Sequence, residues 1–177
     1  NDRNTKCLFS DAASATLLSR DGKLIPGKYK FGTDGKFYDS LIVRNKNNDG
    51  KCINNVLSMN GREIFNFTVG KIPNEISDVC KINNLSEQEI DHFVIHQASS
   101  YVISSIAERV KHDVADKFVD YMYLFGNTVS SSIPISLCQL TNDMDDIENK
   151  ILISGFGVGL SLGSVVLFSK GSFVYEK

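Results

Sequence analysis

Residues 92–111 read HFVIHQASSYVISSIAERVK, and this stretch decides the class of fold. The run HFVIH at its start is apolar with β-branched members, which predicts a short buried strand. The segment from Ser99 to Lys111 instead repeats its apolar residues at helical spacing, which predicts an amphipathic helix. Strands that alternate with helices in this way are typical of a layered α/β domain.

The same alternation continues on both sides of this stretch. Helices are predicted from Asn60, from Ser86 and over Ser131–Thr141, and strands over Lys6–Phe9, Ala12–Ser19, Lys28–Phe31, Leu41–Val43, Ile151–Ser154 and Ser164–Phe168. The last two strands are close enough in the chain to be antiparallel neighbours. Residues 20–58 are rich in Gly, Asn, Asp and Lys and form the least regular part, either a surface insertion or an excursion that faces a substrate or partner.

Polar residues mark where two of these helices begin. Asn60 is the predicted N-cap of the first, with Glu63 three residues later, and Ser86-Glu87-Gln88-Glu89 is a second capping-box signal. Pro73 inside the first helix predicts a kink. Apolar spacing predicts the buried face of that helix to contain Phe65, Val69, Ile72, Ile76 and Val79.

Composition limits the possible classes of function. The 177 residues are the size of one domain, with 42% hydrophobic and 23% charged residues. The formal net charge of −2 provides no basic excess for nucleic-acid binding. No apolar run is long enough to cross a bilayer and no signal-peptide pattern is present, so we expect a cytoplasmic protein without membrane contacts. Because the chain begins at Asn1 rather than Met, we also expect a segment or a processed product of a longer protein.

The cysteines give no sign of a metal site or a disulfide framework. Cys7, Cys52, Cys80 and Cys138 contain no CxxC pair and no cluster with histidines. Cys7 lies in an apolar strand-like run, and Cys80 and Cys138 lie on apolar helix faces. Buried free thiols are therefore expected.

Three short motifs contain residues suited to chemistry. The first, His96-Gln97-Ala98, puts a histidine at the end of a predicted strand, where it either projects into a cleft to exchange a proton or serves as a buried structural residue. A zinc site built on His92 and His96 is not expected, because their spacing suits a helix rather than a strand and no third ligand is evident.

The second motif, Gly126-Asn127-Thr128, offers an amide that can hold an oxyanion while uncharged, although Gly-Asn is also a common turn. The third, Gly155-Phe156-Gly157-Val158-Gly159, lets backbone N–H groups approach a bound carbonyl, and is equally consistent with a glycine-rich β-turn. It is not a dinucleotide or P-loop fingerprint, because no helix follows it and no Lys-Ser/Thr pair closes it. The three motifs are far more specific together, in this order and spacing, than singly.

With these motifs the chain resembles the β-ketoacyl-acyl-carrier-protein synthase III family of thiolase-like condensing enzymes. The resemblance is carried by LFSDAASATLL (8–18), MNGREIFNF (59–67), VIHQAS (94–99), FGNTVSSSIP (125–134) and GFGVGLSLGS (155–164). It implies an α/β fold in which residues 1–177 are the C-terminal thiolase-like domain, the βαβαβαββ half of a layered α/β/α/β/α architecture. It also implies an N-terminal half that supplies the catalytic Cys, whose sequence context none of the four cysteines here matches.

The resemblance implies roles for eight residues. His96 and Asn127 would bind the carbonyl of a malonyl thioester and stabilise the enolate formed on decarboxylation. The backbone N–H of Val158 would belong to a second oxyanion hole for the acyl thioester. The pantetheine arm and the tunnel walls are expected at Gly61, Ala98, Ser99, Phe65 and Phe156. Phe65 is about equally consistent with the ordinary core face of a helix.

The implied enzyme is an acyltransferase of fatty-acid or related lipid biosynthesis that needs no cofactor or metal. Its implied partners are acyl carrier protein, coenzyme A thioesters, the N-terminal half and, at full length, a second copy in a homodimer. Four residues depart from the family pattern: Ser99 for an Asn, Tyr101 for a basic residue, Val158 for a Gly and Leu162 for a Trp. The alternatives are a non-catalytic domain that binds acyl carrier or pantetheine, a thiolase, or a hydroxymethylglutaryl-CoA synthase.

Overall fold

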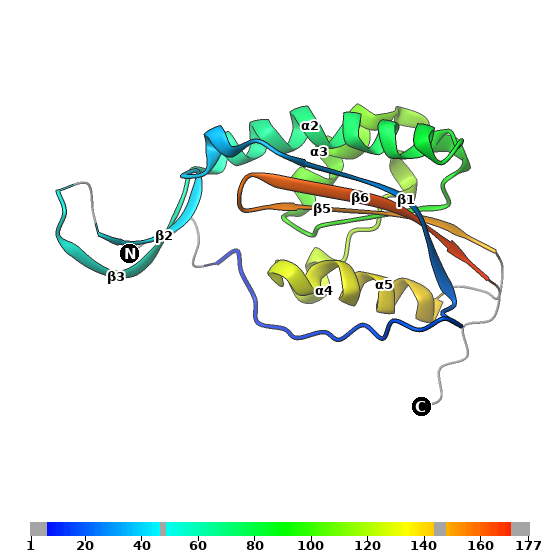
Figure 1. The fold of residues 1–177 in the computed structure, drawn as a ribbon, viewed down its shortest axis with the longest axis horizontal. Helices are drawn as coiled ribbons and strands as arrows, with labels where there is room; N and C mark the ends of the chain where they lie inside the picture. The colour runs from blue at the N-terminus through cyan, green and yellow to red at the C-terminus, as the bar shows by residue number, and fades with distance from the viewer. Residues whose placement is uncertain (1–6, 47–48, 144–147, 171–177) are drawn as a thin grey trace.

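The computed structural model describes residues 7–46, 49–143 and 148–170, and within them a mixed sheet lies between two layers of helices (Figure 1). The sheet has the spatial order β1 (Leu24–Thr33), β6 (Ser161–Ser169), β5 (Lys150–Gly157) and β4 (His92–Ile95). β4 and β5 run parallel, whereas β5 and β6, like β6 and β1, are antiparallel. The predicted antiparallel pairing of the last two strands is therefore confirmed.

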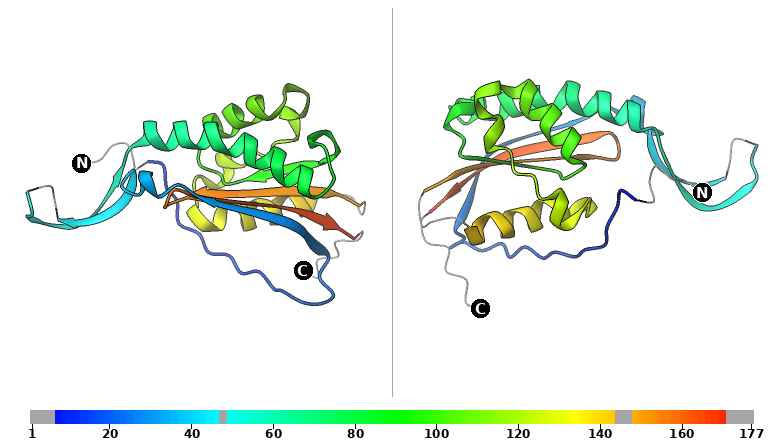
Figure 2. Two further views of the ribbon diagram at one scale, coloured as in Figure 1. Left: turned by 45° about the horizontal axis from the view of Figure 1, so that its top comes forward. Right: turned by 180° about the vertical axis from the view of Figure 1, so that it is seen from behind.

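Helices cover both faces of this sheet. α2 (Gly61–Ile82) and α3 (Ser100–Val110) pack together on one face, while α4 (Met122–Phe125) and α5 (Ser132–Asp143) lie on the other (Figures 1 and 2). Between α3 and α5, where a βαβαβαββ unit has its third strand, the structure has one parallel bridge between Phe93 and Phe118. The Val119 N–H extends it by donating to the Phe93 carbonyl at 3.0 Å. The order of elements otherwise follows the predicted half.

Helix α2 begins where the sequence predicts its N-cap. Asn60 Oδ1 accepts a hydrogen bond from the Glu63 N–H at 3.3 Å. The Glu63 carboxylate accepts a bond from the Ser40 hydroxyl instead of returning to Asn60, whose own N–H donates to the Ser40 carbonyl at 2.7 Å. The helix continues through Pro73, and the predicted apolar face from Val69 onward is buried. These bonds fix the start of α2 to the loop that precedes the hairpin.

The main hydrophobic core fills the space between the sheet and the α2–α3 layer. Its fully buried side chains include Phe93 from β4, Ile72 and Ile76 from α2, and Ile106 from α3. Burial of each such side chain stabilises the fold by about 1.5–3 kcal/mol. The carboxyl end of β4 is therefore held by the most densely buried part of the molecule.

The segment expected to be least regular is largely β structure. β1 extends beyond the predicted Lys28–Phe31, η1 (Gly35–Phe37) follows it, and β2 (Leu41–Lys46) pairs with β3 (Cys52–Met59) in an antiparallel hairpin. The hairpin projects from the body of the molecule (Figure 1). The predicted strand at Leu41–Val43 lies in β2, while the sequence gives no strand prediction for β3.

The predicted strand over residues 12–19 is wrong. Lys6 lies outside the described residues, and Phe9 makes a single parallel bridge with Asn127. Residues 10–19 run extended past α4 and α5 without strand pairing, and Leu17 and Leu18 are 91% and 89% exposed (Figure 1). An apolar β-type sequence forms a strand only where another strand supplies partners for its N–H and C=O groups.

The prediction of buried thiols holds for one cysteine and is wrong for three. Cys80 on α2 is buried, and this burial raises the pKa of its thiol to about 12, whereas Cys7, Cys52 and Cys138 are exposed. On α5 the buried row has an i, i+4 spacing: Ser132, Ser136 and Leu140. Cys138 lies off this row, because the inner face of α5 follows the serines rather than the apolar residues.

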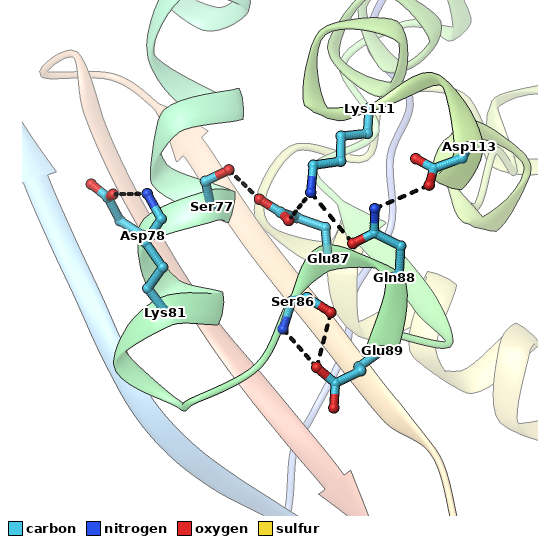
Figure 3. A network of polar contacts seen from close by, with 9 residues as sticks. All are labelled: Ser77, Asp78, Lys81, Ser86, Glu87, Gln88, Glu89, Lys111 and Asp113. Atoms are coloured by element: carbon cyan, nitrogen blue, oxygen red, sulfur yellow. Dashed lines mark hydrogen bonds and ion pairs between the residues drawn. The ribbon is translucent and has the colours of Figure 1, made fainter.

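A polar network joins α2, η2 (Glu87–Glu89), Lys111 at the C-cap of α3, and η3 (His112–Lys117) (Figure 3). The predicted capping box is present, with the Ser86 N–H donating to the Glu89 carboxylate at 2.8 Å. Glu87 is 7% exposed, and its carboxylate accepts bonds from the Ser77 hydroxyl and from Lys111 Nζ, the latter at 2.8 Å. Burial opposes ionisation of Glu87, but the bonds from Lys111 and Ser77 outweigh it and lower the pKa of Glu87 to about 2.

This network predicts acid sensitivity. Because the folded-state pKa of Glu87 lies below its ordinary 4.5, the carboxylate stabilises the fold above pH 4.5 and loses this effect as the pH falls towards 2. We expect a loss on the order of 2–3 kcal/mol over that window. Urea unfolding from pH 6 down to this window measures it, and Glu87→Gln should flatten the dependence. Glu108→Gln, at an exposed site on α3, should keep the wild-type dependence; equal flattening in both variants contradicts the assignment.

Candidate active site

A cavity of about 550 Å³ lies at the carboxyl ends of the parallel strands β4 and β5. Its walls come from the N-terminal segment, the base of the hairpin, the first turns of α2 and α3, the start of α5 and the β5–β6 turn. It is lined by all eight residues that the sequence selects: His96, Asn127, Val158, Gly61, Phe65, Ala98, Ser99 and Phe156. Among the described residues, no Lys, Arg, Asp or Glu lines it. A crevice at the carboxyl ends of strands is the usual ligand site of open α/β sheets.

His96 directly follows β4 and is held through both its backbone and its ring. Its N–H donates to the Ser154 carbonyl on β5 at 2.9 Å, which extends the parallel ladder by one residue. Its Nδ1 lies 2.6 Å from the Ser132 hydroxyl, and its ring meets Phe156 edge to face with centroids 5.3 Å apart. Burial lowers the pKa of His96 to about 4, so the imidazole is neutral at pH 7.

Asn127 is 4% exposed and lies in the loop between α4 and η4 (Val129–Ser131). Its Oδ1 accepts the Val129 N–H at 3.0 Å, while Nδ2 lies 3.4 Å from the Ala98 carbonyl. The first contact fixes the amide and holds Val129 at a φ of 54°, which is unusual for a β-branched residue. Because the second contact is long, the NH₂ group retains donor capacity toward a ligand.

Gly126 is required by the backbone that delivers Asn127. It adopts φ 67° and ψ −164°, a region essentially confined to glycine. A Cβ at this position would lie 2.8 Å from Ser10 Oγ. The Ser10 N–H also donates to the Asn127 carbonyl at 2.9 Å, so the Gly-Asn pair and the N-terminal segment fit together closely.

We therefore expect Gly126→Ala to destabilise the protein by about 1–3 kcal/mol and to displace the Asn127 amide. Urea unfolding measures the first effect, and ligand binding the second. Gly70→Ala is the matched control, because Gly70 is an exposed position of α2 where a Cβ has nothing within 4 Å. That change should stabilise the helix by about 0.5–1 kcal/mol. Shifts of the same sign in both variants contradict the role given to Gly126.

The glycine-rich motif spans the end of β5 and the turn after it. Gly155, Phe156 and Gly157 are still strand residues, and the turn begins at Val158. The Val158 side chain is 68% exposed and lines the cavity. The turn therefore contributes to the wall of the cavity.

Phe65 of α2 and Tyr101 of α3 contribute a pair of aromatic rings to the cavity lining. Their rings stack with centroids 5.3 Å apart and an interplanar angle of 12°, and Tyr101 is 70% exposed. Phe65 lines the cavity and also packs against the main core, as expected for the buried face of a helix. Ser99 Oγ accepts the Val102 N–H at 3.2 Å as the N-cap of α3, which leaves this side chain committed to the helix.

Sequence reasoning missed several lining residues. Ser132 belongs to the small polar run that follows Asn127, but that run does not distinguish it from the neighbouring serines. Leu8 and Phe9 come from the N-terminal segment and Met59 from the hairpin base, and no local pattern indicates that they meet at a cavity.

The described ranges contain neither a metal site nor a membrane-spanning helix. No group of three or more His, Cys, Asp or Glu there is arranged to hold a metal ion. No helix of that part of the chain is long and apolar enough to cross a membrane. None of the four cysteines is among the residues that line the cavity.

The family described as 3-oxoacyl-[acyl-carrier-protein (ACP)] synthase III C terminal matches residues 80–168, half of the chain. The chain belongs to the 3-oxoacyl-[acyl-carrier-protein] synthase III family. The matched range includes His96, Asn127 and the β5–β6 turn, so it covers the polar part of the cavity. Gly61 and Phe65, at the start of α2, lie before it.

Relatives in the synthase III family extend the match over nearly the whole chain. The β-ketoacyl-[acyl-carrier-protein] synthase III of Lactococcus lactis subsp. cremoris (strain MG1363) is 33% identical over 177 residues, with 94% of this chain and 54% of the relative covered. That of Clostridium novyi (strain NT) is 36% identical over 170 residues, with 92% and 52% covered. The chain thus spans about half the length of the relatives that it matches.

Solved structures of synthase III proteins agree. The enzyme from Thermus thermophilus superposes with a TM-score of 0.76 at 28% identity, covering 97% of this chain and 55% of that one. The 3-oxoacyl-(acyl carrier protein) synthase III from Pseudomonas aeruginosa PAO1 gives a TM-score of 0.77 at 24% identity, covering 98% and 54%, and supports the fold alone. The predicted fold, the C-terminal half of a thiolase-like architecture, is confirmed.

Proposed function

We propose that residues 1–177 are the C-terminal domain of an acyltransferase that condenses an acyl thioester with malonyl-acyl-carrier-protein. The observation that carries this proposal is the pair His96 and Asn127, which line one uncharged cavity and can both donate a hydrogen bond without bearing a charge. The name shared by the relatives, β-ketoacyl-[acyl-carrier-protein] synthase III, supports the same class of reaction.

In the proposed reaction the malonyl thioester binds with its carbonyl oxygen facing the His96 imidazole and the Asn127 amide. The bond from the methylene carbon to the carboxylate breaks, carbon dioxide leaves, and the electron pair moves into the thioester to give an enolate. Two neutral donors then stabilise the negative oxygen. The step consumes no oxidant or reductant, so we propose that it needs no cofactor.

The enolate carbon next attacks an acyl thioester on a cysteine, and the cysteine thiolate leaves as the new carbon–carbon bond forms. We propose that the backbone N–H of Val158 donates to the carbonyl oxygen of that acyl thioester. This residue lies in the β5–β6 turn, lines the cavity and is also exposed to solvent. This position supports the role. A backbone donor also explains why Val can stand at a position where the family pattern has Gly.

The dimensions and lining of the cavity suit a pantetheine thioester. Its volume of about 550 Å³ falls within the usual range for small-molecule sites. The pantetheine arm carries no charge, in agreement with a lining that has no Lys, Arg, Asp or Glu among the described residues. We propose that Gly61, Ala98 and Ser99 flank the arm and that Phe65 and Phe156 form apolar walls.

The nucleophile of the proposed reaction must come from elsewhere, because no cysteine of this chain lines the cavity. We propose that an N-terminal half supplies it, which is consistent with a chain that spans about half the length of its relatives. The further proposed partners are acyl carrier protein, coenzyme A thioesters and a second copy of the full-length enzyme. Fatty-acid or related lipid biosynthesis in the cytoplasm is the proposed setting.

The same lack of a cysteine favours a second candidate, a domain that binds acyl-pantetheine without catalysing a reaction. Two measurements separate the candidates: binding of malonyl-pantetheine to the chain, followed by nuclear magnetic resonance, and release of carbon dioxide from malonyl-acyl-carrier-protein by the full-length protein. Binding with carbon dioxide release supports the condensing enzyme. Binding without release by the full-length protein supports the binding domain, and failure to bind contradicts both.

A further inference from the structure

We infer that Ser132 is a positioning residue that fixes the tautomer of His96, with the ring proton on Nε2 and the lone pair on Nδ1. The tautomer itself follows from hydrogen bonds alone. Its use in catalysis rests on the proposed function, which it deepens by naming the ring atom that donates to the substrate. Two hydrogen bonds of the Ser132 hydroxyl determine the tautomer.

One of these hydrogen bonds joins Ser132 to the backbone of Gln97. Ser132 is the first residue of α5 and is 2% exposed. Its Oγ lies 3.4 Å from the backbone nitrogen of Gln97. A backbone N–H can only donate, so the serine oxygen accepts this bond.

The other hydrogen bond joins Ser132 to His96, and its direction depends on the serine proton. Within the described residues, the other polar partner of Ser132 Oγ is His96 Nδ1, at 2.6 Å. If Nδ1 carried the ring proton, the serine oxygen would accept two bonds and its own proton would be buried without an acceptor, which proteins avoid. The hydroxyl therefore donates to Nδ1, and the neutral ring carries its proton on Nε2.

Gln97 keeps this arrangement rigid. Its side chain is 2% exposed, and its Nε2 donates to the Ile95 carbonyl at 2.8 Å and to the Val119 carbonyl at 3.2 Å. Its Oε1 accepts the Tyr121 N–H at 2.9 Å. These three bonds fix the residue after His96, so its N–H is directed at Ser132. The Gln of the His-Gln-Ala motif thus acts on the histidine through the serine.

The consequence for the site is a histidine that donates rather than accepts. With Nδ1 engaged behind the ring, Nε2–H is its remaining polar group, and within the described residues it has no protein partner. A serine hydroxyl bears no charge, so it orients the ring without stabilising an imidazolium as a carboxylate would. The arrangement suits a hydrogen bond to a developing oxyanion.

The test is a long-range ¹H–¹⁵N correlation spectrum of the chain labelled with ¹⁵N-histidine, in which protonated and unprotonated ring nitrogens are distinct. The His96 signals are assigned by comparison with a His96→Gln sample. We expect Nε2 to be protonated in the wild type, a mixture of tautomers in Ser132→Ala, and recovery in Ser132→Thr. Ser131→Ala, one position away and without contact to the ring, should match the wild type.

A wild-type spectrum with Nδ1 protonated overturns the inference, and so does an unchanged tautomer in Ser132→Ala. In the full-length protein, Ser132→Ala should lower kcat for decarboxylation by about 10- to 100-fold with little change in KM, and Ser132→Thr should restore it. If His96→Ala leaves decarboxylation unchanged while the spectra behave as expected, the proposed function fails and the tautomer assignment stands.

Discussion

Replacing His96 with alanine is expected to slow the decarboxylation of malonyl-acyl-carrier-protein by about 10²- to 10³-fold, because a preformed donor to a developing oxyanion has an effect of that size. Carbon dioxide release by the full-length protein measures it. His92→Ala is the matched control, since His92 lies at the other end of β4 and is not among the residues that line the cavity. Similar losses in both variants would show that the histidines act through the fold rather than the chemistry.

Asn127→Asp tests the second donor of the same site without changing its shape. A carboxylate oxygen can still accept the Val129 N–H, which lies 3.0 Å from Oδ1 in the structure, but the NH₂ donor is lost. A negative charge beside the enolate adds repulsion, so we expect a loss of about 10²-fold or more in decarboxylation rate. A rate within about threefold of the wild type would remove Asn127 from the proposed mechanism.

The largest expected effect on stability comes from Phe93→Ala, at about 3–5 kcal/mol. Phe93 is fully buried in β4, and its ring stacks on Phe118 with centroids 4.4 Å apart. Removing it leaves a cavity between the sheet and α3 and loosens the strand that ends at His96. Urea unfolding measures the change in the free energy of unfolding.

Phe31→Ala is the control for this substitution, because the same side chain on β1 is 73% exposed. Its loss should cost no more than about 1 kcal/mol. A cost for Phe93→Ala as small as that for Phe31→Ala would show that the core between the sheet and the α2–α3 layer does not hold the site in place.

Segments whose signals are local could be predicted from the sequence. Three such features are present: the Asn60 cap, the capping box at Ser86 and the apolar run of β4. Each depends on residues only a few positions apart in the sequence. In the β2–β3 hairpin the strand at Leu41–Val43 is predicted, whereas β3 is not, because Asn54 and Asn55 interrupt its apolar pattern. The strand expected over residues 12–19 failed for the opposite reason, since its sequence is suitable but the described chain gives it no partner strand.

In the candidate site, too, residues with local sequence signals could be predicted and residues placed by long-range packing could not. His96 and Asn127 stand out because they belong to short motifs, although His96 alone is equally consistent with a structural role and the Gly-Asn pair alone is more typical of a turn. Ser132 could not be singled out, since its interaction with His96 spans 36 residues and a serine in a polar run has no distinctive signal. Only the packing of α5 against β4 brings the two side chains together.

The cavity is lined by residues that lie far apart in the sequence, from Leu8 to Leu160. It can therefore form only after all of these segments have been synthesised. Ser10 bonds to Phe125 across 115 residues, and the hydroxyls of Thr33 and Ser161 meet at 3.0 Å across 128. Closing loops of that length is slow compared with forming α2 or α3. During synthesis on the ribosome those helices can form early, whereas the cavity closes only after the turn at Val158 has emerged. A chain that terminates before that turn would be helical in part, yet would lack the complete cavity.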